Sequence, residues 1–197
     1  ASVILAMTED TGDETIVEED NWVAAVEWVE AGGADLITSS LGYYYWYEYA
    51  DLDGDTALVT RAADMAVGRG MGVFTSAGNE RGNEEWPHLT APADGDSVVA
   101  VGAVDLSGNL AVFSSPGPTY DGRIKPDVAA LGVSNHVASY HDDHSYSSAN
   151  GTSFAAPQVA GVAALMLERI PTLTPMQIRE ALRETASQAA RPDNDMG

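Results

Sequence analysis

The 197-residue sequence contains no cysteine, and Lys125 is the only lysine among its nine basic residues. Without cysteine the chain forms no disulfide bond and offers no thiolate metal ligand, although the redox compartment stays open. No run of 18 apolar residues occurs, so the sequence predicts no transmembrane helix. Ala1 begins a segment that reads as a strand and not as a charged leader, so no signal peptide is predicted within these residues.

Cations are scarce as well, since 30 acidic residues against nine basic ones give a formal net charge of -21. This charge argues against nucleic acid and against anionic membranes as partners. An acidic sequence with almost no lysine is typical of a halophilic protein, because the screening length falls to about 3 Å at 1 M salt and self-repulsion fades. A merely acidic secreted protein is the alternative.

The length suits one domain, which buries about 70% of its unfolded surface. Strand and helix patterns alternate, which predicts an α/β fold of three layers, with a mainly parallel sheet flanked by helices. The predicted strands are residues 2–7, 36–40, 72–76, 97–104 and 110–113, and the predicted helices are residues 21–31, 56–67 and 152–170.

Between these elements, acidic residues 9–20 are predicted to form a solvated loop, and residues 115–132 to form mostly turns and loop. In the second helix, Leu58, Ala62 and Met65 share one apolar face.

A last helix follows Thr174, which is a suitable N-cap before Pro175 at the first helical position. Gln177 completes a capping box, and Leu173 and Ile178 have the spacing of a hydrophobic staple.

Ser153 lies at the start of the third helix, whose residues are small or aliphatic on every side and therefore predict a central, buried helix. Gly151 permits a sharp turn before it, and Thr152 is a candidate cap. Pro157 lacks the N–H that would bond the Ser153 carbonyl, a defect of about 3 kcal/mol in an ordinary helix interior. A serine beside such a defect, surrounded by free helix N–H groups, predicts a functional site.

Residues 150–161, Asn-Gly-Thr-Ser-Phe-Ala-Ala-Pro-Gln-Val-Ala-Gly, resemble the nucleophile motif of subtilisin-like serine proteases. Residues 73–80 resemble the strand of that family that ends in the oxyanion-hole asparagine, and residues 35–42 resemble the strand that pairs with substrate. Residues 98–104 and 113–128 also match in order, so the resemblance covers almost the whole chain as one partial peptidase domain, residues 1–197.

The resemblance implies a serine endopeptidase domain that cleaves peptides or proteins by acyl-enzyme chemistry, with Ser153 as the nucleophile and Asn79 in the oxyanion hole. It requires no cofactor. Extended substrate would add as a strand between two short segments. These segments are Ser40, Leu41 and Gly42, and Ser76, Ala77 and Gly78.

The sequence departs from the family because neither an Asp-Thr/Ser-Gly strand end nor a His-Gly-Thr-His helix occurs, so the catalytic aspartate and histidine are missing. The four histidines, His88, His136, His141 and His144, do not match the position of the family's base. We therefore expect the C-terminal part of a catalytic domain, inactive by itself. The missing residues and a secretion signal are expected upstream, which predicts an extracellular or cell-envelope protein.

Two other functions stay open: a pseudoprotease or peptide-binding module that uses the cleft without cutting, and an unrelated acidic protein that binds cations. The aromatic run 43–49 predicts either a wall for aromatic or apolar substrate side chains or a loop packed on its own domain.

Three further segments have residue types found in metal or glycan sites. Residues 51–55 are acidic, but glycine stands fourth and Ala62 stands twelfth, which fails the EF-hand pattern. Members of the family often carry structural calcium, yet no calcium motif transfers to this chain. Residues 141–144, His-Asp-Asp-His, have ligand types for a transition metal, although a surface loop is favoured. The sequon at Asn150 is discounted because it abuts the buried helix.

Overall fold

The computed structural model describes residues 1–10, 12, 14–139 and 142–197. The helices are α1 (Val17–Ala31), α2 (Leu58–Gly68), α3 (Thr152–Arg169) and α4 (Pro175–Thr185), with a short 3-10 helix, η1 (Tyr49–Asp51). The strands are β1 (Leu36–Ser39), β2 (Gly72–Ser76), β3 (Val99–Val104), β4 (Val128–Leu131), β5 (Asn135–Ala138) and β6 (Tyr146–Ala149).

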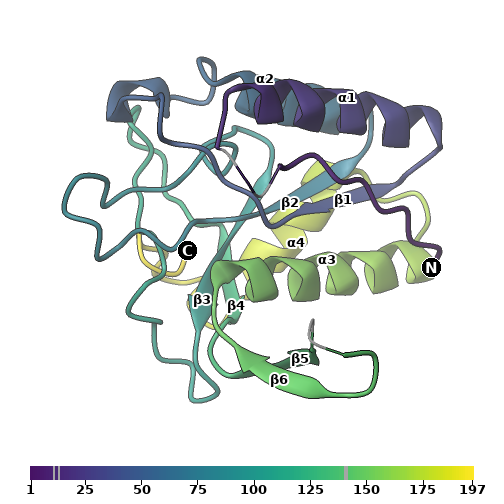
Figure 1. Cartoon of the computed structure of the whole chain (residues 1–197). Helices are drawn as coiled ribbons and strands as arrows, with labels where there is room; N and C mark the ends of the chain where they lie inside the picture. The colour runs from purple at the N-terminus through teal and green to yellow at the C-terminus, as the bar shows by residue number, and fades with distance from the viewer. Residues whose placement is uncertain (11, 13, 140–141) are drawn as a thin grey trace.

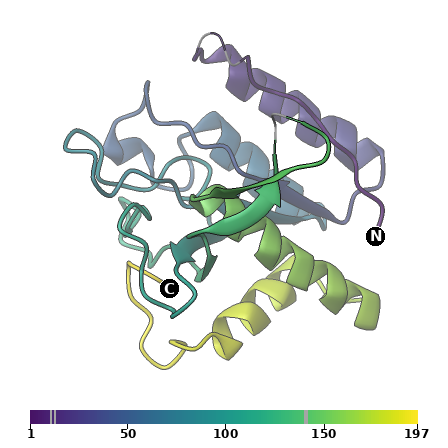
Figure 2. The ribbon, with the colours of Figure 1, turned by 60° about the horizontal axis from the view of Figure 1, so that its bottom comes forward.

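Strands β1, β2, β3 and β4 form a parallel sheet in that order, and β5 pairs with β6 in an antiparallel hairpin. Helices α1 and α2 lie together on one face of the sheet, while α3 packs across all four strands on the other face (Figure 1). Figure 2 shows the same three layers from a second direction, with α4 beside α3. The predicted three-layer α/β fold is confirmed.

The core consists of two apolar clusters, one on each face of the sheet. Val73 belongs to the cluster under α1 and α2, and its neighbour Phe74 belongs to the cluster under α3 and α4. Successive side chains of a strand point to opposite faces, so a strand covered on both sides buries consecutive residues. All five residues of β2 are buried, which explains why its bounds were predicted to the residue.

The predicted strand at residues 2–7 is wrong, because no described strand pairs with this segment. Val3, Leu5 and Met7 are each more than 80% exposed. Without a neighbouring strand the extended segment has no ladder to join. Figure 1 shows it crossing in front of β1 toward the start of α1.

The predicted acidic loop is also wrong at its end, because α1 begins at Val17 and not at residue 21. Glu18 and Glu19 are 2% and 0% exposed. The Glu19 carboxylate accepts hydrogen bonds from Trp46 Nε1 at 2.6 Å and from the Tyr47 hydroxyl at 2.7 Å. These donors replace water around the buried carboxylate and allow the helix to start earlier.

Helix α2 packs through a different face from the predicted one. Leu58 and Met65 are exposed, whereas Val59, Ala63 and Ala66 are buried. The buried residues follow one another at intervals of four and three, which is also a helical stripe. Their small side chains let the helix lie close to the sheet.

Three elements between β3 and α3 differ from the sequence interpretation. Residues 110–113 form no strand but only one bridge, between Leu110 and Val104. The predicted loop at 115–132 contains β4, which pairs with β3. The hairpin of β5 and β6 was not predicted, because its residues alternate too weakly in polarity to indicate strands.

Helix α3 occupies the predicted span to within one residue, but its apolar surface is not buried all round. Ala155, Val159 and Ala163 face the sheet and are buried, while Val162 and Leu165 are 47% and 65% exposed. The sheet covers one face of the helix, and no described element covers the opposite one.

The predicted start of α4 is confirmed. The Gln177 N–H donates to Thr174 Oγ1, and the Thr174 N–H donates to Gln177 Oε1, with Pro175 at the first helical position. Leu173 and Ile178 belong to one apolar cluster, as the staple requires. Among the described helices none is long and apolar enough to cross a membrane.

Candidate active site

The end of β1 meets the start of α3, and two serines hold them together. The Ser40 hydroxyl donates to the Ser153 carbonyl at 2.8 Å. The Ser153 hydroxyl donates to the Ser40 carbonyl at 3.3 Å. Sequence reasoning placed both residues near substrate but did not predict this reciprocal pair.

The Ser40 hydroxyl also repairs the helix defect at Pro157. Because Pro157 has no N–H, the Ser153 carbonyl four residues earlier loses its helical donor. The Ser40 hydroxyl donates to this same oxygen. The proline therefore leaves an acceptor that fixes β1 against the start of α3, at the candidate nucleophile.

Asn79 is oriented by the residue before Ser153. Its Oδ1 accepts from the Thr152 N–H at 2.9 Å and from the Thr152 hydroxyl at 3.1 Å. Because the amide oxygen is occupied by Thr152, the Asn79 NH₂ group remains as a donor directed elsewhere. Thr152 is fully buried, and it orients Asn79 instead of capping α3.

Gly151 makes the turn into α3 possible, since its φ of 149° lies in a region that L side chains rarely adopt. Its N–H donates to the Gly132 carbonyl at the end of β4. The start of α3 is thus fixed to β1 through Ser40 and to the loop after β4 through Gly151.

A cleft with a volume of about 190 Å³ opens at this point. Of the predicted site residues, Ser40, Leu41, Gly42, Ser76, Gly78, Asn79 and Ser153 line it. Ala77 does not, because its side chain is fully buried below that surface. The remaining lining residues are Glu9, Glu14, Tyr44, Tyr45, Glu80 and Thr90.

Gly42 is required by space. A Cβ atom at this position would lie 2.1 Å from the Thr90 hydroxyl oxygen, well inside contact distance. Thr90 precedes Ala91, which pairs with Tyr43, so the absence of a side chain at Gly42 lets these two segments lie close together beside the cleft.

None of the described histidines hydrogen-bonds the Ser153 hydroxyl. His88 stacks on Tyr49 at 3.9 Å between ring centroids, and burial lowers its pKa below the ordinary value. His136 stacks on Tyr146 in the hairpin. His144 lies in an exposed turn, and His141 lies outside the described residues.

The aromatic run contains residues that pack on the domain and residues that line the cleft. Tyr43, Trp46 and Tyr47 pack on the domain, and their polar atoms donate to Glu9 or Glu19. Tyr44 and Tyr45 line the cleft and stack on each other at 4.3 Å.

The acidic loop at residues 51–55 is organised by its own hydrogen bonds. Burial by itself would raise the pKa of Asp53, but donors from Asp55 and Thr56 hold it below its usual range. The His-Asp-Asp-His segment includes His141, outside the described residues, and in its described part Asp142 accepts from Ser145. Asn150 of the sequon accepts from the Ser134 N–H.

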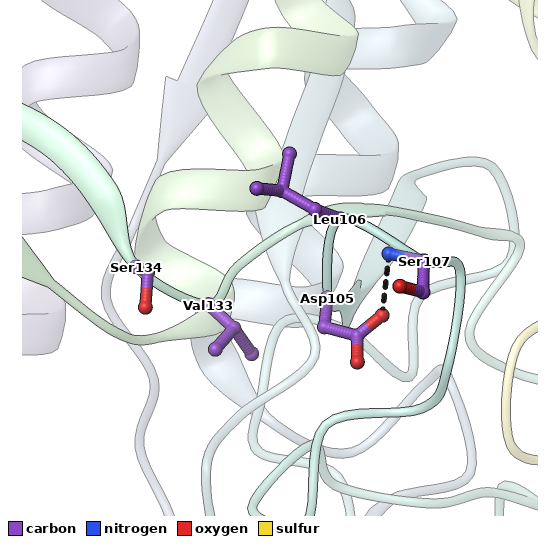
Figure 3. A pocket seen from close by; sticks show the side chains of 5 residues that line it. All are labelled: Asp105, Leu106, Ser107, Val133 and Ser134. Carbon is purple, nitrogen blue, oxygen red and sulfur yellow. Dashed lines mark hydrogen bonds between the residues drawn. The ribbon is translucent and has the colours of Figure 1, made fainter.

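A second hollow of about 170 Å³ lies between the loop after β3 and the loop after β4 (Figure 3). Its acid, Asp105, accepts from the Ser107 N–H at 2.7 Å, drawn as a dashed line in Figure 3, and from Asn109. The Asp105 carboxylate is therefore engaged in forming its own turn.

Comparison with solved structures finds a similar fold in known proteases. A cold adapted subtilisin-like serine proteinase superposes with a TM-score of 0.71 at 27% identity, over 94% of this chain and 62% of that one. The self-cleaved protease domain of PatA also superposes with a TM-score of 0.71 at 27% identity. This match covers 90% of the present chain and 63% of the PatA domain.

Sequence comparison agrees. The chain is 41% identical to Subtilisin DY of Bacillus licheniformis over 165 residues, covering 84% of this chain and 54% of that protein. It is 38% identical to Subtilisin E of Bacillus subtilis (strain 168) over 176 residues, which cover 89% of this chain and 42% of that protein. The chain thus spans about half the length of these relatives. The family model described as Subtilase family matches residues 4–197, and the chain belongs to the subtilase family.

Proposed function

We propose that this chain supplies the nucleophile and oxyanion hole of a serine endopeptidase. The observation that supports this most strongly is the convergence of Ser153, Asn79 and the end of β1 on one open cleft. In the reaction, Ser153 Oγ attacks a peptide carbonyl carbon while a base takes its proton. The leaving amine departs with that proton, and water then hydrolyses the acyl-enzyme.

Asn79 and the first turn of α3 would stabilise the tetrahedral intermediate. Thr152 occupies the Asn79 amide oxygen, so the NH₂ group is the part free to bind an oxyanion. The Ser153 N–H belongs to the first helical turn, whose amides lack partners within the helix. Both donors act in place before reaction, which is the condition for effective electrostatic stabilisation.

Peptides and proteins are the proposed substrates, bound as an added strand between residues 40–42 and 76–78. The proposal is supported by the lining of the cleft, to which both segments contribute residues. The chemistry requires no cofactor. Nucleic acid and anionic membranes remain excluded partners in this proposal, because of the charge of -21.

We infer that the base and its orienting acid lie outside these 197 residues. This inference is supported by the described histidines, none of which hydrogen-bonds the Ser153 hydroxyl. We therefore expect no peptidase activity from the 197-residue chain alone. A serine hydroxyl without a base is a weak nucleophile. A peptide-binding pseudoprotease is the alternative, and it shares the same cleft.

Labelling with a fluorophosphonate and peptide hydrolysis by the whole gene product distinguish the two. We expect labelling at Ser153 and activity that Ser153→Ala abolishes. Asn79→Ala should lower kcat about 10²- to 10³-fold, the range known from a subtilisin, with little change in KM. Ser107→Ala, at an exposed turn, is the control. Peptide binding without labelling or cleavage would support the pseudoprotease instead.

An extracellular or cell-envelope location and a saline environment complete the proposal. The location is supported by the similarity to subtilisins, and the saline environment by the acidic composition. Self-repulsion among 30 acidic residues weakens as salt rises. The halophilic interpretation requires that the midpoint of thermal unfolding increase between about 0.1 and 1 M NaCl, and a flat response would contradict it.

A further inference from the structure

Three glutamates gather where the chain enters α1. One carboxylate oxygen from each of Glu9, Glu14 and Glu18 lies within 4.8 Å of the others. Among the described residues this is the one group of three or more metal-ligating side chains with such spacing. Glu9 and Glu14 precede the helix, and Glu18 lies in its first turn.

Glu18 is unusual within this group because it is 2% exposed. Its Oε1 accepts from the Asp10 N–H at 2.9 Å. Its Oε2 is buried and has no hydrogen-bond partner among the described residues. A buried carboxylate oxygen without a donor is costly, so this atom indicates a missing positive or donating group.

No described cation neutralises the group. The ion pairs of the described chain have their acids elsewhere, at Glu30, Asp96, Asp121, Asp127 and Asp195. Glu9 accepts from the Tyr43 and Thr8 hydroxyls, which are neutral donors. Three carboxylates therefore share a partly buried position without a protein counter-ion.

The three carboxylates repel one another when they are ionised, because their oxygens lie within 4.8 Å and an ionised carboxylate accepts but does not donate hydrogen bonds. A bound cation would relieve this repulsion.

We propose that Glu9, Glu14 and Glu18 bind one calcium ion. Calcium binds oxygen ligands at about 2.3–2.6 Å, so oxygens on one ion lie within about 5 Å of each other, as here. Flexible coordination with carboxylates suits calcium better than magnesium, which demands octahedral geometry and retains water. The group has no sulfur or imidazole, which disfavours transition metals.

The site would connect two parts of the molecule. Glu9 and Glu14 line the cleft that holds Ser153, whereas Glu18 is anchored in α1. A shared ion would hold this wall of the cleft against the helix. Because the wall is acidic, a lysine side chain of a peptide is the competing occupant.

Calorimetric titration of the 197-residue chain with CaCl₂ at pH 7.5 in 1 M NaCl tests the proposal. The salt suppresses diffuse cation binding to the acidic surface. We expect one equivalent of bound calcium, and at least tenfold weaker binding in Glu14→Gln and in Glu18→Gln. Glu27→Gln removes the same charge from an exposed position of α1 and should change the affinity less than twofold.

Glu14 is exposed, so its variant should fold, and circular dichroism checks this. Equal calcium affinity in Glu14→Gln and Glu27→Gln would overturn the proposal, as would an absence of calcium binding. Binding of a trilysine peptide that Glu14→Gln abolishes, without calcium binding, would assign the group to substrate. Because the readout needs no peptidase activity, failure of the proposed function leaves this test intact.

Discussion

Asp127 and Glu18 are both acidic and almost completely buried, yet their surroundings are opposite. Asp127 accepts from Lys125 Nζ at 2.7 Å, from Arg179 Nε at 2.9 Å and from the Ala100 N–H at 2.9 Å. Glu18 accepts from one backbone amide, and its other oxygen has no described partner. The single lysine of the chain, Lys125, therefore lies beside Asp127, just before β4, and its Nζ donates both to Asp127 and to the Val98 carbonyl.

The difference indicates that Asp127 stabilises the fold, whereas Glu18 is suited to bind a cation. Burial by itself would raise the pKa of Asp127, but Lys125 and Arg179 hold it below its usual range. Although Glu14 is exposed, partial desolvation beside Glu18 and the neighbouring carboxylates raise its pKa. The two clusters should therefore respond in opposite directions when a charge is removed or the pH is lowered.

The largest effect is expected for Lys125→Met. The Lys125 side chain is fully buried and also donates to the Val98 carbonyl. Its loss leaves Asp127 buried with one charged partner fewer, and breaking a buried pair in this way costs about 3–5 kcal/mol. Urea unfolding followed by tryptophan fluorescence measures the change in the free energy of unfolding.

Arg69→Met is the matched control for Lys125→Met. The Arg69 ion pair with Glu30 is 3.4 Å long and exposed on both sides. Exposed pairs contribute about 0–1 kcal/mol, so this variant should stay close to the original chain. Similar losses in the two variants would show that burial of the Lys125 pair has no special weight.

A second, smaller effect is expected for Asp127→Asn, at about 3 kcal/mol at pH 7, because the amide oxygen still accepts one hydrogen bond. The native pKa of Asp127 is lowered, so its ionised form stabilises the fold above the unfolded pKa of about 3.9. That stabilisation is lost as the pH falls through the native pKa. The difference between variant and original should therefore shrink below about pH 4.

Unfolding measured from pH 2 to pH 7 gives this difference directly. The other carboxylates titrate in both proteins and largely cancel. A difference that stays constant across the range would contradict the lowered pKa of Asp127.

Sequence patterns predicted the elements whose determinants are local. Residues 72–76 contain the apolar pair Val73 and Phe74 between nearby glycines, and the capping box at Thr174 contains all its partners within four residues. The start of α1 depends instead on Trp46 and Tyr47, which donate to Glu19 from 27 and 28 residues away. Residues 2–7 resemble a strand, but strand formation needs a neighbour that a local pattern cannot supply.

The same limit applies to the site. The motif around Ser153 and the strand ends at Ser40 and Asn79 were predicted from the sequence, and all three line one cleft. The hydrogen bond from the Ser40 hydroxyl to the Ser153 carbonyl, which Pro157 leaves without a helical donor, was not predicted. It joins residues that lie 113 positions apart in the sequence. The acidic cleft wall was missed for the same reason, because residues 9–20 read as solvated when taken alone.

The smallest effect, and the one of opposite sign, is expected for Glu14→Gln in the presence of EGTA. The native pKa of Glu14 is raised, so its ionised form at pH 7 destabilises the fold, and this penalty disappears as the pH falls through the native pKa. Because Glu14 is exposed, solvent limits the gain in the variant to about 0.5 kcal/mol.

Thermal unfolding from pH 4 to pH 8, with EGTA or with calcium, distinguishes repulsion from structural support. With EGTA, Glu14→Gln should equal or slightly exceed the original at pH 7, and the two should converge toward pH 4. With calcium the order should reverse, because the ion stabilises only the chain that binds it. A variant that is clearly less stable in EGTA would mean that Glu14 supports the fold as Asp127 does, and the contrast between the two clusters would fail.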